Sequence, residues 1–156
     1  MISAATNRLL LVLALLWAAL ACGPQGPTSN TTLVLGTGES RFESLTQGQE
    51  VTLVRGPQGG VHLWMSLQAT GLNPQKVWLD VGTTLGDVHQ DTRNITQLQS
   101  QGERAELVGW PVILDESVLV DGSMLQLHVV VTDESGESAD GHIQVRVKLP
   151  AQAANG

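Results

Sequence analysis

The feature that most constrains this chain is a series of short runs in which apolar and polar residues alternate with a period of two. Residues 143–149 alternate without an error, and the odd positions of residues 61–67 are all Val, Leu or Met. Successive side chains of a β-strand point to opposite faces of its sheet, so this period predicts strands with one buried face. The clearest runs are 51–54, 61–67, 77–81, 107–114, 125–131 and 143–149.

Clusters of Gly, Pro, Asn and Asp separate these runs, as expected of turns between strands. No stretch after residue 32 shows the spacing of an amphipathic helix, and the polar segment 91–104 could hold at most one helical turn. The pattern predicts an all-β fold, an antiparallel β-sandwich formed by a single domain at residues 33–150. We expect the last residues, 151–156, to form a disordered tail.

The last two strands are predicted to form a hairpin. Residues 125–131 run into the polar loop 134–140, and the chain returns as residues 143–149. Pairing Val131 with Ile143 puts the aliphatic side chains of both strands on one face, which would be the buried face.

A short motif within this hairpin adds to the prediction of the fold. It reads V-x-V-x-D-x-x-G, and its residues are Val129, Val131, Asp133 and Gly136. The motif resembles the final strand pair of immunoglobulin-like bacterial domains, which implies an immunoglobulin-like sandwich and leaves function open. The chain has no Cys-Trp-Cys core, so antibody-type domains are excluded. We therefore expect Trp64 or Trp78 to fill the centre.

The start of the chain is typical of an exported protein. Arg8 precedes an apolar run of 13 residues at 9–21, which ends in small residues before Cys22. A membrane-spanning helix needs about 20 apolar residues, so the run predicts a cleaved signal peptide at residues 1–21. The sequence Ala-Leu-Ala-Cys at 19–22 resembles the lipobox of bacterial lipoproteins. This resemblance implies that Cys22 is acylated and becomes the first residue of the mature protein.

The alternative is an ordinary signal peptide that happens to end near a cysteine. Cys22 is the only cysteine of the chain, and exported proteins seldom keep an unpaired thiol, so lipidation explains it better. In the lipoprotein family an aspartate after the cysteine retains the protein at the inner membrane in some bacteria, so Gly23 favours the outer membrane. Residues 23–32 contain two prolines and no apolar side chain, and together with the lipidated Cys22 they predict a flexible tether (22–32).

The charge of the chain narrows the class of partner. The formal net charge is −7, and the basic residues are scattered singly. Nucleic acid is not an expected partner, because phosphate binding requires clustered Lys and Arg. The same scatter argues against electrostatic adhesion to anionic lipids. We expect a bacterial cell-envelope protein held at the membrane by its lipid, with another envelope protein or a glycan as its partner.

The segment 55–64 is the best candidate for a contact surface. Three glycines and a proline lie between two strands, which is more flexibility than a plain hairpin needs. His62, Trp64 and Ser66 would share one face of the second strand. The alternative is a long turn beside a partly exposed strand face. The predicted partner-contact residues are Arg55, Gln58, His62 and Trp64.

Metal binding is predicted only weakly, and no cofactor is expected. The four histidines do not stand at close ligand spacing in the sequence. Asp87, His89 and Asp91 would share one face of a strand. The acidic loop near residue 135 offers the oxygen ligands that calcium prefers. Its weak candidates are Asp133, Glu134, Glu137 and Asp140.

No enzyme signature is present in the sequence. There is no Gly-x-Ser-x-Gly elbow, no His-Glu-x-x-His and no phosphate-binding loop before a helix. We therefore expect a non-catalytic binding or structural role in the cell envelope. The alternative is a carrier of a ligand, calcium or a transition metal, which would use His62, His89 or the acidic loop.

Overall fold

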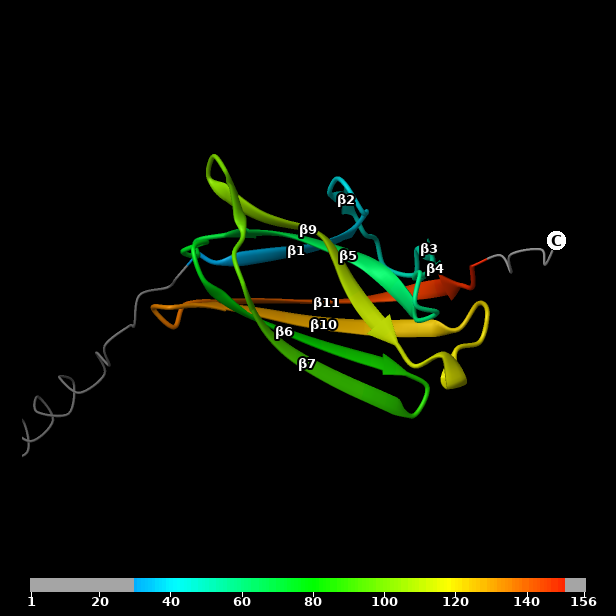
Figure 1. Cartoon of the computed structure of the whole chain (residues 1–156). Helices are drawn as coiled ribbons and strands as arrows, with labels where there is room; N and C mark the ends of the chain where they lie inside the picture. The colour runs from blue at the N-terminus through cyan, green and yellow to red at the C-terminus, as the bar shows by residue number, and fades with distance from the viewer. Residues whose placement is uncertain (1–29, 151–156) are drawn as a thin grey trace, which may run out of the picture.

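A computed structural model describes residues 30–150, in which two β-sheets pack face to face (Figure 1). The predicted signal peptide, Cys22, most of the tether and the predicted tail lie outside the described residues. The strands are β1 (Thr32–Thr37), β2 (Glu43–Ser44), β3 (Glu50–Thr52), β4 (Val54–Arg55), β5 (Val61–Thr70), β6 (Val77–Leu85), β7 (Val88–Thr96), β8 (Gln99–Gln101), β9 (Arg104–Leu114), β10 (Met124–Asp133) and β11 (Ser138–Lys148), with a short 3₁₀ helix, η1 (Glu116–Val118), before β10.

The predicted all-β sandwich is confirmed. The upper sheet in Figure 1 has the order β2-β1-β5-β9-β8, with β4 also on β5, and the lower sheet has the order β3-β11-β10-β6-β7. All pairs are antiparallel except β3 with β11, which run parallel. The sandwich is therefore mixed rather than purely antiparallel.

The core consists of aliphatic side chains supplied by alternate positions of the long strands. On β10 the odd positions from Leu125 to Val131 are at most 1% exposed, and Val145 and Val147 on β11 are fully buried. Burying one such side chain stabilises the fold by about 1.5–3 kcal/mol. The expectation that Trp64 or Trp78 fills the centre is wrong, because both lie at the outward positions of their strands and are only half-buried.

The predicted β10–β11 hairpin is present, but its predicted register is wrong by four residues. Val131 pairs with Ala139, not with Ile143, and the loop is shorter than the predicted 134–140 because β11 already begins at Ser138. A slip by an even number of residues keeps every side chain on its face. The face prediction therefore holds although the pairing does not.

The polar segment 91–104 contains no helical turn, which is within the predicted limit of one. Most of it forms the end of β7 and all of β8. β7 is polar on both faces and forms one edge of the lower sheet. β8 pairs only with the first residues of β9, so in the described structure the second half of β9 is an edge of the upper sheet. These two edges border the groove described below.

Candidate functional site

The predicted contact loop, residues 55–64, contains a tight turn, and Arg55 is held by hydrogen bonds to other parts of the domain. The amide of Gly56 donates to the carbonyl of Gly60 over 2.7 Å. The Arg55 guanidinium donates to the Gly59 carbonyl and to the carboxylate of Glu116. Glu116 is the first residue of η1 and lies 61 residues after Arg55 in the sequence. The hydrogen bond and the attraction between the opposite charges of Arg55 and Glu116 raise the pKa of Arg55 and lower the pKa of Glu116. Gln58 is exposed at the tip of the turn.

His62 and Trp64 do share one face of β5, as predicted. The face is less open than predicted, however, because His62 is only 7% exposed and Ser66 is fully buried. The His62 and Trp64 rings meet edge to face, with centroids 4.5 Å apart. Within the described residues the buried His62 Nε2 has no hydrogen-bond partner. Val54 and Ile113, both exposed, flank His62 on the neighbouring strands.

The acidic turn between β10 and β11 is organised by the buried carboxylate of Asp133. Its Oδ1 atom accepts hydrogen bonds from the Ser135 amide, the Ser135 hydroxyl and the Glu137 amide, and its Oδ2 atom accepts one from the Asn73 amide. Burial raises the pKa of Asp133, but the hydrogen bonds from Ser135, Asn73 and Glu137 outweigh it, and the pKa lies below its ordinary value. Asp133 therefore stabilises the turn and is occupied by protein donors.

This arrangement predicts an acid-sensitive step in stability. The pKa of Asp133 is lower in the folded state than in the unfolded state, so its ionised carboxylate contributes to the free energy of unfolding. This contribution is complete above the unfolded-state pKa of about 3.9 and is lost as the pH falls through the folded-state pKa. Asp133→Asn would place an amide donor among donors, so it should lower the free energy of unfolding at pH 7 by about 2 kcal/mol. Urea unfolding at pH 7 and pH 3 should show the wild-type advantage shrinking at pH 3. An equal advantage at both values would contradict this role.

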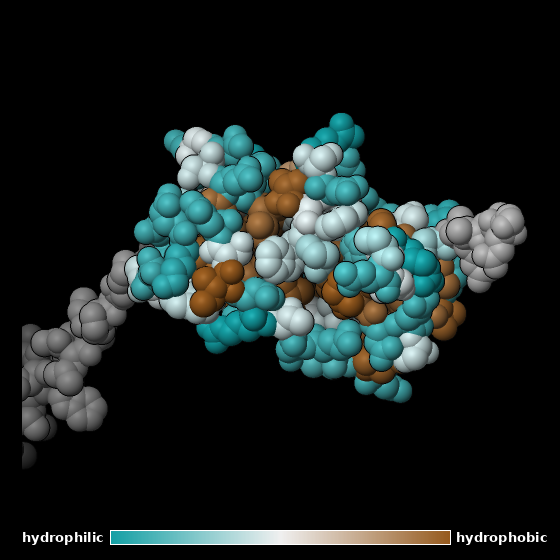
Figure 2. Space-filling view, viewed as in Figure 1, coloured by the Kyte–Doolittle hydropathy of each residue, from teal (hydrophilic) through white to brown (hydrophobic). Residues whose placement is uncertain are grey.

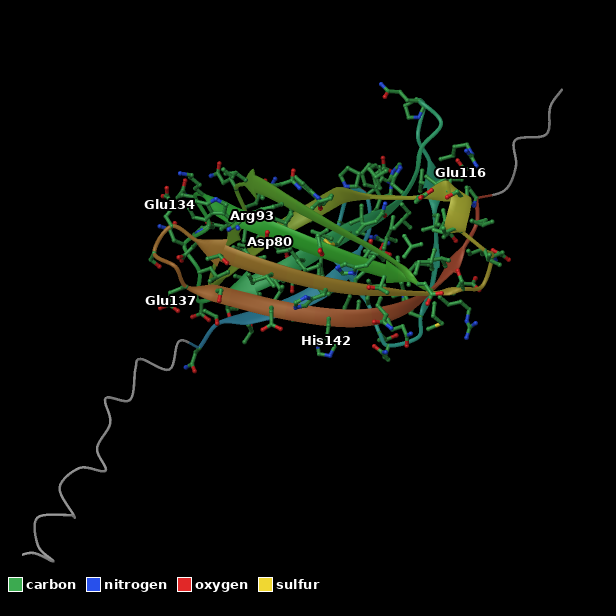
Figure 3. All side chains as sticks on the ribbon, turned by 90° about the horizontal axis from the view of Figure 1, so that it is seen from below. Asp80, Arg93, Glu116, Glu134, Glu137 and His142 are labelled. Carbon is green, nitrogen blue, oxygen red and sulfur yellow. The ribbon has the colours of Figure 1, made fainter. Side chains whose placement is uncertain are left out.

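The four weak calcium candidates do not converge. Glu134 pairs with Lys76 at 3.0 Å, and Asp140 lies on β11 with its Oδ2 atom 3.9 Å from His128 Nε2. Figure 3 shows Glu134 and Glu137 on opposite sides of the turn. Within residues 30–150 no three His, Cys, Asp or Glu side chains are placed to hold one metal ion.

The largest hollow that we describe is a groove of about 600 Å³ between the two open edges, β7 and β9. In Figure 2, brown apolar side chains show in the hollow between the upper and lower sheets. The inward positions of β7 from Gln90 to Thr96 carry amide and hydroxyl side chains, whereas the inward positions of β10 carry mainly aliphatic ones. The lining residues are Val81, Thr83, Gln90, Asp91, Thr92, Asn94, Trp110, Pro111, Val112 and Ile113.

A β-bulge in β9 turns Trp110 toward this groove. The β5–β9 register shifts between Met65 and Leu67, so that Met65 pairs with Trp110 while Leu67 pairs with Leu107. The extra residue reverses the alternation of β9, which puts Trp110 on the inner side. The Ser66 hydroxyl accepts a hydrogen bond from the Gly109 amide and donates to the Gly38 carbonyl. Ser66 thus holds the bulge in place.

Replacing Gly109 tests the bulge. Gly109 has φ +70°, and a Cβ atom there would lie 2.3 Å from the Glu39 carbonyl oxygen. Gly109→Ala should therefore lower the free energy of unfolding by about 3 kcal/mol. One part of this loss is the cost of the left-handed backbone for alanine, and the other is the overlap of its Cβ atom with the Glu39 carbonyl. Gly102→Ala is the control, because Gly102 has φ +65° and no atom would lie within 4 Å of the new Cβ. Equal losses in urea unfolding of the two variants would contradict the close contact.

A second hollow lies on the outer face of the lower sheet and contains three histidines, His89, His128 and His142. His128 and His142 stand directly opposite each other on β10 and β11. The ring nitrogens of His89 are 2.9 Å from the Thr84 hydroxyl and 2.9 Å from the Asp91 carboxylate. His89 and Asp91 do share a face, as predicted for this segment. Asp87 precedes β7 and lies in the turn.

The chain matches no protein-family model and no curated protein. Among residues 30–150, no helix has the length and apolar character required to cross a bilayer.

Proposed function

We propose that this protein is exported to the bacterial cell envelope, is anchored there by a lipid on Cys22, and binds another envelope component without converting it. The proposal on export rests on the apolar run 9–21 and the lipobox-like residues 19–22. Three acyl chains on Cys22 would hold the protein firmly, since a single chain gives only marginal binding. Residues 23–31, which precede β1 in the sequence, would let the sandwich extend away from the membrane, and Gly23 favours the outer membrane.

The groove between β7 and β9 is the observation that carries the proposed binding role. Its volume lies in the range of about 300–1,000 Å³ that is typical of ligand sites. Amide and hydroxyl groups donate and accept hydrogen bonds without changing protonation near neutral pH, so they suit the holding of a ligand. Pro111 and Ile113 line the groove and are also strand partners of Trp64 and His62. A bound partner could therefore contact both the groove and the predicted surface beside residues 55–64.

Co-sedimentation tests the binding role. The lipid-modified protein, purified in detergent, should sediment with envelope fragments from which lipids have been extracted. Gln90→Ala combined with Asn94→Ala should reduce the bound fraction, because both amides line the groove. The control is Gln126→Ala, an exposed amide on the outer face of β10. Absence of wild-type binding, or equal binding by the groove variant, would contradict the proposal.

One observation favours the second candidate function, a metal carrier. Directly opposite residues of antiparallel strands have Cβ atoms about 4.5–5.5 Å apart, and His128 and His142 are such a pair. Two imidazoles at this spacing could share a Zn²⁺ or Cu²⁺ ion at about 2.0–2.1 Å from each nitrogen. Figure 3 shows His142 pointing out from β11, so this exposed side chain would have to rotate toward His128.

Thermal unfolding with zinc, copper or calcium separates the two functions. An ion at about 100 times its dissociation constant adds about 2.7 kcal/mol, which raises the melting temperature by several degrees. If the protein is a carrier, zinc or copper should give this increase, and His142→Gln should remove it. His89→Gln should leave the increase intact, because both ring nitrogens of His89 already have partners. No increase with any ion would contradict the carrier function.

A further inference from the structure

We propose that the groove between β7 and β9 binds an uncharged saccharide. This inference rests on the proposed function and names the class of ligand for the same groove. One wall has an indole side chain and the other has amide and hydroxyl side chains. Within residues 30–150, no lysine or arginine lines the groove.

Trp110 provides the apolar wall. The bulge at Gly109 directs it inward, where it pairs with buried Met65, yet it remains partly exposed and lines the groove. An indole ring has a broad apolar face with a negative quadrupole. The C–H groups on one face of a sugar ring carry partial positive charge and stack on such a face. Val112, the next inward residue of β9, extends the apolar wall beside Trp110, whereas Pro111 and Ile113 line the groove from the outward positions of the strand.

The opposite wall, on β7, provides hydrogen-bonding groups. Gln90, Thr92 and Asn94 occupy alternate positions of β7, and Thr83 on β6 lines the groove behind them. Each amide offers both a donor and an acceptor, and each hydroxyl can act as either. Sugar hydroxyls also donate and accept hydrogen bonds, so two neighbouring hydroxyls can bind the N–H and the C=O of one side-chain amide. The Thr92 hydroxyl makes only a long hydrogen bond of 3.5 Å to the Val81 carbonyl, which leaves it able to take a ligand.

The charge of the groove selects against anionic ligands. Among the described residues that line the groove, Asp91 is the only charged one, and its carboxylate is hydrogen-bonded to His89. The whole chain carries a formal charge of −7. A phosphate or carboxylate ligand would be repelled and would find no cation. An uncharged polyhydroxyl ligand avoids this cost.

The edge of β9 also argues against an extended peptide as the ligand. Strand addition depends on a row of free N–H and C=O groups along an edge. Pro111 has no N–H group, and the bulge beside Gly109 interrupts the regular spacing of the edge. A peptide added along residues 107–114 would therefore lose ladder hydrogen bonds. A saccharide needs only the side chains.

Isothermal titration of the full-length, detergent-purified protein tests the inference. The probes are soluble uncharged oligosaccharides of glucose, mannose, galactose and N-acetylglucosamine. At least one should bind saturably. Asn94→Ala should weaken its binding about fivefold to tenfold, through loss of one hydrogen bond. Trp110→Ala should weaken it at least about 30-fold, as expected for a central aromatic contact.

Two controls keep the result specific. Trp78→Ala removes a tryptophan on the outer face of β6, where Lys76 lies over its ring, and should leave binding unchanged. Trp110→Phe should retain much of the affinity because an aromatic face remains. Asn94→Ala tests the groove even if Trp110→Ala does not fold.

The outcomes separate this inference from the proposed function. If none of the oligosaccharides binds but delipidated envelope fragments bind equally before and after periodate treatment, the saccharide assignment is overturned and the binding role stands. If neither binds, both are overturned. Protease treatment of the fragments that abolishes binding would assign the groove to a protein partner and overturn the inference. Loss of binding after periodate cleavage of vicinal diols in the fragments would support it.

Discussion

Replacing Val145 with aspartate is expected to unfold the sandwich. Val145 on β11 is fully buried, and its strand partner Leu125 on β10 is buried as well. A carboxylate at this position would have no hydrogen-bond donor and no cation beside it, which costs several kcal/mol. The total stability of a domain is about 5–15 kcal/mol, so the loss removes most of it. Circular dichroism should show an unfolded chain at 25 °C and no cooperative transition on heating.

The matched control introduces the same charge on the surface. Val120 is 65% exposed before β10, so Val120→Asp should melt within a few degrees of the wild type. A cooperatively folded Val145→Asp variant would mean that the inward and outward faces of β11 are reversed.

Replacing Cys22 with serine is expected to move the protein from the membrane to the soluble fraction. Serine provides no thiol for acylation, and without acyl chains the sandwich has no other proposed attachment. After export in a Gram-negative host, the wild type should sediment with membranes at high salt, whereas the variant should remain in the supernatant. Its thermal unfolding should match that of the wild type, because Cys22 precedes the domain in sequence.

Gln25→Ser is the control for this experiment. It makes a substitution of similar size in the predicted tether, keeps Cys22, and should stay with the membranes. Retention of Cys22→Ser in the membrane fraction would show that another part of the chain holds the protein there.

The strands and their buried faces could be predicted because alternation is a local property. Leu125–Val131 and Val145–Val147 follow from side-chain period alone. The register of β10 with β11 could not be predicted, because slips by even numbers bury the same face. The turn chemistry decides the register: Asp133 accepts hydrogen bonds from Ser135 and Glu137, which closes a short turn.

The His128–His142 pair could not be predicted from the sequence, because the predicted β10–β11 register does not place these two residues opposite each other. Residues 14 apart in sequence become opposite neighbours only in the true pairing. The groove could not be predicted for another reason, since its polar wall on β7 lacks the apolar alternation that indicates a strand. Two features of the sequence do point to it. Gln90, Thr92 and Asn94 alternate with charged residues, and Gly109 marks the bulge that moves Trp110 to the inner face of β9.

Intact-mass spectrometry of the protein isolated from its native membrane tests the central proposal most directly, namely that a lipid on Cys22 anchors this sandwich in the envelope. We expect a mass that lacks residues 1–21 and includes added acyl groups on a chain that begins at Cys22. A product that retains residues 1–21, or one with an unmodified Cys22 thiol, would contradict it.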